Sequence, residues 1–84
     1  MIKIYSKNNC PKCQMTKQIL SQHSINFSEI NVEKDLTEEE FNEKISFFKN
    51  LNMMMFPVVE FVTEHGEKDY FSGFKPEKLM SFGK

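Results

Sequence analysis

The sequence predicts an α/β domain in which a mixed four-stranded sheet is flanked by three helices, in the order β-α-β-α-β-β-α. Segments rich in β-branched and aromatic residues alternate with segments whose apolar residues recur at helical spacing. A helix between the first two strands requires that they pair in parallel through a right-handed crossover. A short turn at His65-Gly66 instead makes the last two strands an antiparallel hairpin. We expect residues 1–84 to form a single domain around one modest core.

The opening residues predict a strand followed by a helix. Ile2 and Ile4 alternate with less apolar residues over positions 2–5, which is the period of a strand. Pro11 fits the first position of a helix, where the N–H that proline lacks is not needed. This helix is expected to run to about His23, with apolar residues at Met15, Ile19 and Leu20.

A second strand and a second helix follow. Residues 27–32 alternate as a strand does, with an apolar face formed by Ile30 and Val32. Thr37 followed by Glu40 is a capping-box pattern, in which each side chain accepts a hydrogen bond from the other residue's backbone N–H. The helix that begins there is expected to run to about Asn50, with an apolar stripe at Phe41, Ile45 and Phe48.

The C-terminal part predicts a hairpin and a short helix. Residues 56–62 are β-branched and aromatic and form a third strand, with Pro57 near its start. The turn at residues 65–66 leads to a fourth strand over residues 68–71. Pro76 then begins a short helix with apolar residues at Leu79, Met80 and Phe82.

The only two cysteines lie in the quartet Cys10-Pro11-Lys12-Cys13, at the start of the first helix. Residues i and i+3 lie on one helix face, so the two sulfurs can form a disulfide or a dithiol with little backbone movement. The free N–H groups and the helix dipole at this position favour a thiolate, which is the nucleophile of disulfide exchange. The quartet therefore indicates a redox site. We expect Cys10 to attack and Cys13, one turn further in, to resolve the mixed disulfide.

Composition argues against several other classes of protein. Two cysteines are too few for the disulfide framework of a small secreted domain. The first residues lack the pattern of a signal peptide, and no apolar run is long enough to span a bilayer. We therefore expect a cytoplasmic protein that does not bind membranes. The net charge of −1 gives no reason to expect binding to nucleic acid.

The charges are unevenly distributed along the chain. Residues 1–28 contain no acid, whereas residues 29–43 contain seven acids and one lysine. The early lysines, which include Lys7 and Lys12, make the cysteine end electropositive. Positive charge favours a cysteine thiolate and can steer an acidic partner to it. The alternative is that both segments are ordinary solvated surface.

Four motifs occur in order along the chain. They are the C-x-x-C at residues 10–13, Asn31-Val32 at the end of the second strand, Pro57-Val58-Val59, and Phe71-Ser72-Gly73-Phe74-Lys75-Pro76. Together they resemble the thioredoxin fold and, within it, the NrdH-redoxins, which are glutaredoxin-like in sequence but behave like thioredoxin. The last motif is similar to the family segment W-S-G-F-R-P, with Phe71 in place of Trp and Lys75 in place of Arg.

The resemblance implies a cytosolic dithiol electron carrier. Such a carrier is reduced by thioredoxin reductase, which uses NADPH, and it reduces the disulfide in the large subunit of class Ib ribonucleotide reductase. The resemblance further implies a monomer without a bound cofactor, in which the reversible Cys10–Cys13 disulfide carries the electrons.

The resemblance also assigns roles to residues around the cysteines. Pro11 and Lys12 support the active site, and Pro57 is a cis proline that faces the cysteines, where an ordinary edge proline is the alternative. The Phe56 backbone is free to pair with a bound peptide. Further partner-binding residues are expected at Phe71, Ser72, Gly73 and Phe74. Core packing is the alternative for the two phenylalanines of this segment, and we expect it for one of them.

Two other functions stay open. A glutathione-dependent glutaredoxin ordinarily has an aromatic residue in place of Lys12, Thr-Val in place of Met55-Phe56, and a Gly-Gly pair and an acid in place of Ser72-Gly73-Phe74. A metal site is the other alternative, although zinc needs four ligands and only two histidines accompany the cysteines. An iron–sulfur cluster shared between two chains is the form of metal site that fits best. We assign no residue as a metal ligand.

The run Met53-Met54-Met55 lies just before the third strand. We expect these side chains to fill the core. The alternative is a soft docking surface near the active site, because methionine adapts to irregular partners.

Overall fold

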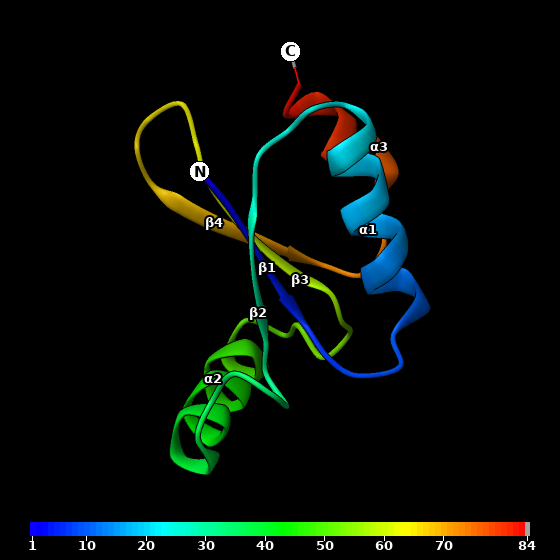
Figure 1. Ribbon diagram of the computed structural model, residues 1–84. Coiled ribbons are helices and arrows are strands. Elements are labelled where there is room, and N and C mark those ends of the chain that lie inside the picture. Colours follow the sequence, from blue (N-terminus) through cyan, green and yellow to red (C-terminus); the bar gives the residue numbers. More distant parts are fainter. Residues whose placement is uncertain (84) are drawn as a thin grey trace.

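The computed structural model describes residues 1–83 and confirms the predicted order of elements. The strands and helices are β1 (Ile2–Ser6), α1 (Pro11–Gln22), β2 (Ser28–Asn31), α2 (Glu38–Asn50), β3 (Val58–Val62), β4 (Lys68–Ser72) and α3 (Pro76–Ser81) (Figure 1). The predicted bounds differ by only one or two residues at most ends.

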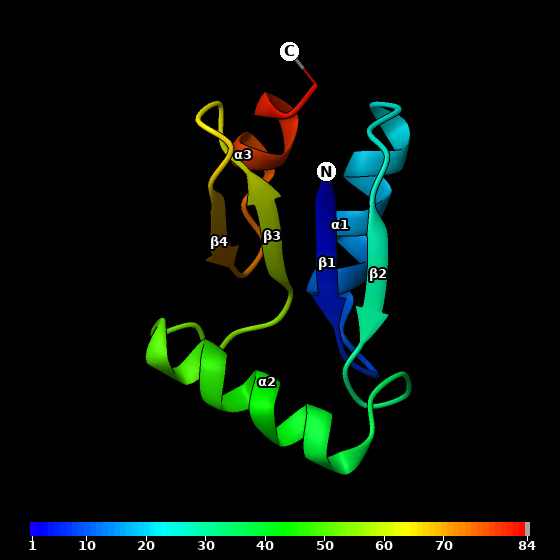
Figure 2. The same ribbon diagram turned by 90° about the vertical axis from the view of Figure 1, so that its left-hand side faces the viewer.

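The four strands form one mixed sheet in the order β2-β1-β3-β4. β1 and β2 are parallel, and β3 is antiparallel to both of its neighbours (Figure 2). The register places Tyr5 opposite Val58, and Val58 opposite Ser72. The end of β1, the start of β3 and the end of β4 therefore lie side by side at one end of the strands. Three segments that are distant in sequence meet at this end of the strands.

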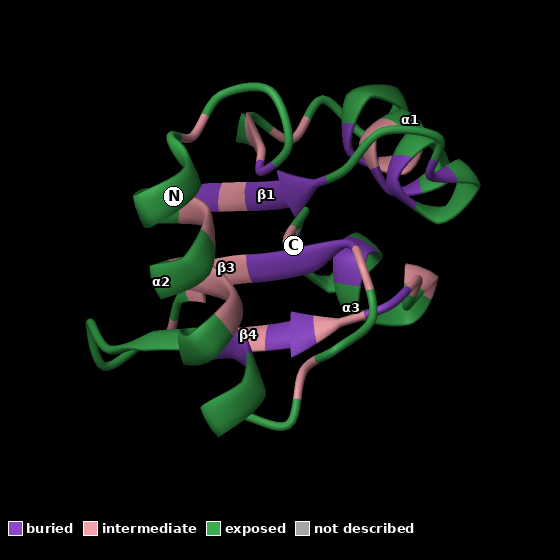
Figure 3. Cartoon of the chain, turned by 90° about the horizontal axis from the view of Figure 1, so that it is seen from below, coloured by how far each residue is buried: buried purple, intermediate pink, exposed green. Residues whose placement is uncertain are grey.

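Helices cover both faces of the sheet. α1 and α3 lie on one face and α2 crosses the other, as Figures 1 and 3 show. Because side chains alternate along each strand, the sheet supplies apolar residues to both sides. The core under α1 and α3 buries Ile2, Ile4, Leu20, Val59, Phe71 and Leu79. The core under α2 buries Tyr5, Val32, Phe48 and Val58.

α2 begins at the predicted capping box. The Glu40 N–H donates to Thr37 Oγ1 at 3.2 Å, and the Thr37 N–H donates to Glu40 Oε1 at 2.9 Å. Phe48 is the one residue that this helix buries fully. Its ring meets the Tyr5 ring edge-on, with centroids 5.3 Å apart. A narrow apolar contact thus holds α2 on the sheet.

The buried face of α1 differs from the prediction at one position. Met15 is 41% exposed, and Thr16 is buried in its place. Cys13, Thr16 and Leu20 are spaced by three and four residues and therefore form one stripe of the helix. Thr16 satisfies its hydroxyl by donating to the Lys12 carbonyl oxygen at 2.8 Å.

The prediction that the three methionines fill the core is wrong for two of them. Met54 and Met55 are 58% and 53% exposed. The chain turns at Asn52, whose φ of 58° is left-handed, and then runs over the surface to the start of β3. Only Met53, whose N–H donates to the Phe48 carbonyl oxygen at 2.8 Å, packs against the core under α2.

Candidate active site

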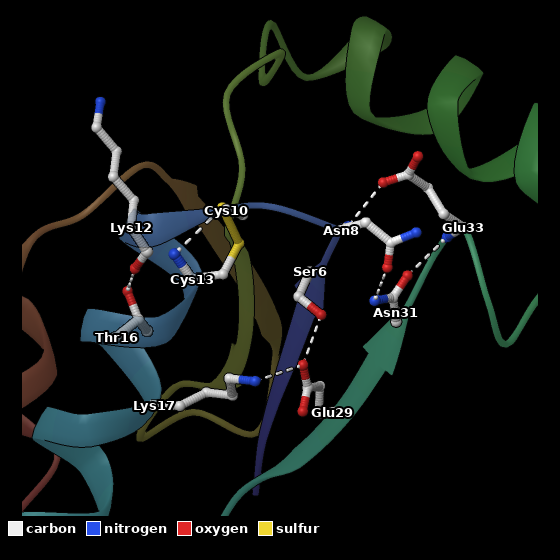
Figure 4. Close-up of a disulfide and its surroundings, with 10 residues drawn as sticks. All are labelled: Ser6, Asn8, Cys10, Lys12, Cys13, Thr16, Lys17, Glu29, Asn31 and Glu33. Atoms are coloured by element: carbon white, nitrogen blue, oxygen red, sulfur yellow. Dashed lines mark hydrogen bonds and ion pairs between the residues drawn. A yellow bond between two sulfur atoms is a disulfide. The ribbon is translucent and has the colours of Figure 1, made fainter.

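Cys10 and Cys13 are joined by a disulfide at the beginning of α1, with Cα atoms 5.3 Å apart (Figure 4). Cys10 is the N-cap residue and Pro11 occupies the first turn, as the sequence predicts. Asn9 has a left-handed φ of 53°, a conformation that asparagine adopts more readily than most residues. This conformation turns the chain from the loop after β1 into the helix.

The two sulfurs differ in access and in hydrogen bonding. Cys10 is 8% exposed and Cys13 is 2% exposed. The Cys13 N–H donates to Cys10 Sγ at 3.2 Å. In the reduced protein, an N–H directed at this sulfur favours its thiolate form. The geometry therefore favours Cys10 as the attacking sulfur and Cys13 as the sulfur that completes the exchange.

An open groove of about 420 Å³ lies beside Cys10. Its walls are Lys7, residues 9–12 and residues 54–56. The exposed side chains of Met54 and Met55 make it partly apolar. The Lys7 Nζ lies 5.8 Å from the centroid of the Phe56 ring. The described residues that line this groove include two lysines and no acid.

Pro57 directly precedes β3, at the end of the strands where β1 and β4 also end. The Phe56-Pro57 peptide bond is cis, as expected, and the proline is fully buried. Its carbonyl oxygen accepts a hydrogen bond from the Gly73 N–H at 2.8 Å. Gly73 has a φ of 82°, which favours glycine, and a Cβ added there would lie 3.9 Å from the Met55 methyl group. Met55 rather than the Gly73 backbone thus presents the surface here.

Phe71 packs in the core, which is the alternative to partner binding for this residue. Its side chain is only 2% exposed, and its ring lies 6.0 Å from that of Phe61 and 6.3 Å from that of Phe82. The alternation of β4 directs Phe71 to the side covered by α1 and α3. Phe74 packs against the same core, so core packing applies to both phenylalanines and not to one.

The other three expected partner-binding residues are Ser72, Gly73 and Phe56. Ser72 is half-buried at the end of β4, with Gly73 buried beside it. Phe56 is half-buried and lines the groove beside Cys10. Within the segment 71–74, the surface contribution is therefore small, and the groove is formed mainly by residues before Pro57.

A second, polar pocket of about 550 Å³ lies on the other side of Cys13. Within it, Glu29 Oε2 accepts hydrogen bonds from Ser6 Oγ at 2.6 Å and from Lys17 Nζ at 2.9 Å (Figure 4). Partial burial raises the pKa of Glu29, but the hydrogen bonds from Ser6 and Lys17 outweigh it and hold that pKa below its usual value. The pocket thus contains an ionised carboxylate that is already paired.

A set of hydrogen bonds joins the loop before Cys10 to the end of β2. The Asn8 N–H donates to Glu33 Oε1 at 2.7 Å. The side chain of Asn31 donates to Asn8 Oδ1 at 3.1 Å and accepts from the Glu33 and Lys34 N–H groups. Sequence reasoning missed this contact, because its partners are more than 20 residues apart and leave no local pattern.

Within residues 1–83, no three His, Cys, Asp or Glu side chains gather in a way that could hold a metal ion. None of the helices in that range has the length and apolar character needed to cross a bilayer.

Comparisons with known proteins agree with this geometry. The Glutaredoxin family profile matches residues 2–65. Two relatives named glutaredoxin-like protein NrdH, from Lactococcus lactis subspecies cremoris and lactis, are each 39% identical over 80 residues, which cover 94% of this chain and 94% of the relative. The solved structure of the glutaredoxin-like protein NrdH-redoxin from Escherichia coli matches with a TM-score of 0.73 at 25% identity, covering 95% of this chain and 91% of that one. The fold is thus the predicted thioredoxin fold.

Proposed function

The chain belongs to the glutaredoxin family as a thiol-disulfide oxidoreductase of the NrdH type, and from this premise we propose that it carries electrons from thioredoxin reductase to class Ib ribonucleotide reductase. The observation that carries the proposal is the Cys10–Cys13 disulfide at the start of α1, with the outer sulfur beside an open groove. Pro11, Lys12 and Pro57 support the site around this pair.

The proposed reaction has two exchange steps. The Cys10 thiolate attacks one sulfur of the partner disulfide; a Cys10–partner bond forms, the partner S–S bond breaks, and the other partner sulfur leaves as a thiolate. Cys13 then loses its proton to solvent and attacks the Cys10 sulfur. The mixed disulfide breaks, the second partner sulfur leaves, and both partner thiolates take up protons. Two electrons have moved from the dithiol to the partner.

Thioredoxin reductase would restore the dithiol with two electrons from NADPH. No bound cofactor is required in this scheme, because the Cys10–Cys13 pair itself stores the two electrons. We place the protein in the cytoplasm, because thiols stay reduced in that compartment. We expect it to act as a monomer.

Three features support thioredoxin reductase over glutathione as the electron donor. Lys12 stands where glutathione-dependent glutaredoxins ordinarily have an aromatic residue, and Met55-Phe56 stand where they have Thr-Val. The exposed Met55 side chain occupies the groove wall beside the cysteines. The third feature is a relative: the glutaredoxin-like protein NrdH-redoxin from Escherichia coli has a thioredoxin-like activity profile.

The test supplies each electron source separately. The protein is mixed with insulin as the disulfide substrate and with NADPH, and either thioredoxin reductase or glutathione with glutathione reductase is added. We expect NADPH consumption with thioredoxin reductase and little with glutathione. The reverse result would identify a glutathione-dependent glutaredoxin.

The target is tested with the reduction of ribonucleotides by a class Ib enzyme. The protein is expected to support product formation with thioredoxin reductase and NADPH as its only source of electrons. Failure here, with insulin still reduced, would reject the target and leave the donor assignment intact. The Cys10→Ser variant serves as the inactive control in both assays.

A further inference from the structure

We propose that the groove beside Cys10 selects disulfides whose flanking residues are acidic, with Lys7 and Lys12 meeting the carboxylates and Met54 and Met55 packing on the apolar parts of the segment. The proposal rests on the proposed function and names the kind of partner segment that fits the site. Its occupant is an extended segment of a disulfide-bearing protein.

The charges of the groove are available to a partner. Among the described residues the one salt bridge joins Lys17 to Glu29, which lie in the polar pocket and not in the groove. Neither Lys7 nor Lys12 therefore forms a salt bridge with an acid among residues 1–83. Lys12 lies between the two cysteines, so a carboxylate beside the reacting cystine is within its reach. A lysine beside the reacting sulfurs attracts an acidic segment and repels a basic one.

Lys7 also lies beside an aromatic residue of the groove wall. Its Nζ lies over the Phe56 ring, 5.8 Å from the ring centroid. Phe56 itself lines the groove and directly precedes Pro57. The exposed Lys7 side chain thus places its charge at the groove wall, beside Phe56.

The apolar part of the groove has unusual exposure. Met54 and Met55 are each more than half exposed, although the chain has core positions for methionine such as Met53. The Met55 methyl group lies next to Gly73, so the far end of this side chain packs against the backbone after β4. Flexible, polarisable methionine side chains adapt to differently shaped partners. The lysines then provide the selectivity that the methionines lack.

The test uses two peptides that differ only in charge. Each carries one intramolecular disulfide, and the residues on either side of its cysteines are Glu in one peptide and Lys in the other. Pre-reduced protein is mixed with each peptide in a single turnover, stopped with acid and an alkylating agent, and analysed by mass spectrometry. We expect oxidation by the Glu peptide to be at least about tenfold faster at low ionic strength. This ratio should fall toward one as salt is added.

The variants reverse lysine charges either in the groove or away from it. Lys7→Glu with Lys12→Glu should reverse the preference between the peptides. Lys68→Glu should leave the preference between the peptides unchanged, because Lys68 begins β4 at the end of the strands that is opposite to the groove. Any general effect on Cys10 reactivity or on folding cancels, because both peptides react with the same protein sample.

The methionines are tested in the same assay. Met54→Ser with Met55→Ser should slow both peptides severalfold and leave their ratio unchanged. Met80→Ser is the matched control, because Met80 is an exposed methionine of α3 that does not line the groove. It should leave both rates at the wild-type level.

Two results would overturn the proposal. The first is a peptide ratio near one at low salt, with neutral hydroxyethyl disulfide still reduced; failure with that small disulfide as well would instead reject the oxidoreductase chemistry itself. The second is a set of lysine variants that slows only re-reduction by thioredoxin reductase. That result would make the reductase the occupant of the groove.

Discussion

The side-chain N–H of Asn31 donates to the side-chain oxygen of Asn8 at 3.1 Å, across 23 residues of sequence. Asn31 ends β2, and Asn8 lies in the loop that delivers Cys10 to the helix. Because Asn31 also accepts two backbone N–H groups of the following turn, one side chain orders both loops. Asn31 therefore links the loop before Cys10 to the end of β2.

Replacing this residue should loosen both loops. We expect Asn31→Ala to lower the free energy of unfolding by about 1 kcal/mol, because the lost hydrogen bonds are exposed to solvent. Asn31→Asp keeps the two acceptor bonds and should lose less. Urea unfolding measures the first effect, and faster hydrogen exchange at the Glu33 and Lys34 amides measures the local one. Wild-type exchange rates in Asn31→Ala would contradict this account.

The different access of the two sulfurs predicts which variant traps a partner. Cys10 is more exposed than Cys13 and accepts the Cys13 N–H. The Cys13→Ser variant should therefore accumulate a mixed disulfide through Cys10, visible on a non-reducing gel. Cys10→Ser should trap little. Equal trapping by both variants would mean that the roles are not divided as proposed.

The burial of Phe71 separates stability from activity. Phe71→Ala should lower the free energy of unfolding by about 3–5 kcal/mol, because it leaves a cavity between two other aromatic rings. The protein that remains folded should exchange disulfides at the wild-type rate. Urea unfolding and single-turnover oxidation at low temperature measure the two effects. A rate loss in fully folded protein would restore Phe71 as a partner-binding residue.

The two tyrosines predict an unusual alkaline titration. Burial, followed by the hydrogen bond to Glu60 at 3.0 Å, raises the pKa of Tyr70 from 10.0 to about 12. Burial also raises the pKa of Tyr5. The raised values favour the folded state below pH 10, and this stability is lost as the pH rises from 10 toward 12.

Tyrosinate absorbance measures this difference directly. At pH 10 the folded protein should show less tyrosinate than urea-unfolded protein, in which both tyrosines should be about half ionised. Glu60→Gln should lower the pKa of Tyr70, because it removes the carboxylate charge and leaves the burial in place. An identical titration curve for folded and unfolded protein would disprove the shift.

Local patterns predicted most of the fold, and they did so where a short stretch decides the structure. The capping box of Thr37 and Glu40 and the turn at Gly66 both depend on residues within four positions of one another. The alternation of β1 likewise depends only on its own residues. Each of these predictions is confirmed.

Predictions of what a side chain faces were less successful. Met54 and Met55 are as apolar as Met53, and only the left-handed turn at Asn52 determines that they stay outside. Phe71 belongs to a motif associated with partner binding, yet its place in the alternation of β4 directs it inward. Such outcomes depend on register across strands, which no single segment encodes.

The hydrogen bond from Gly73 to the Pro57 carbonyl has a consequence for biosynthesis. The cysteines leave the ribosome early, but Gly73, which donates to the Pro57 carbonyl oxygen, is made more than 50 residues later. A nascent or prematurely terminated polypeptide ending before Gly73 would hold both thiols and the groove residues 54–56, but it would lack the N–H that donates to the Pro57 carbonyl oxygen. The hydrogen bonding around Pro57 is thus complete only in chains that have been translated almost to the end.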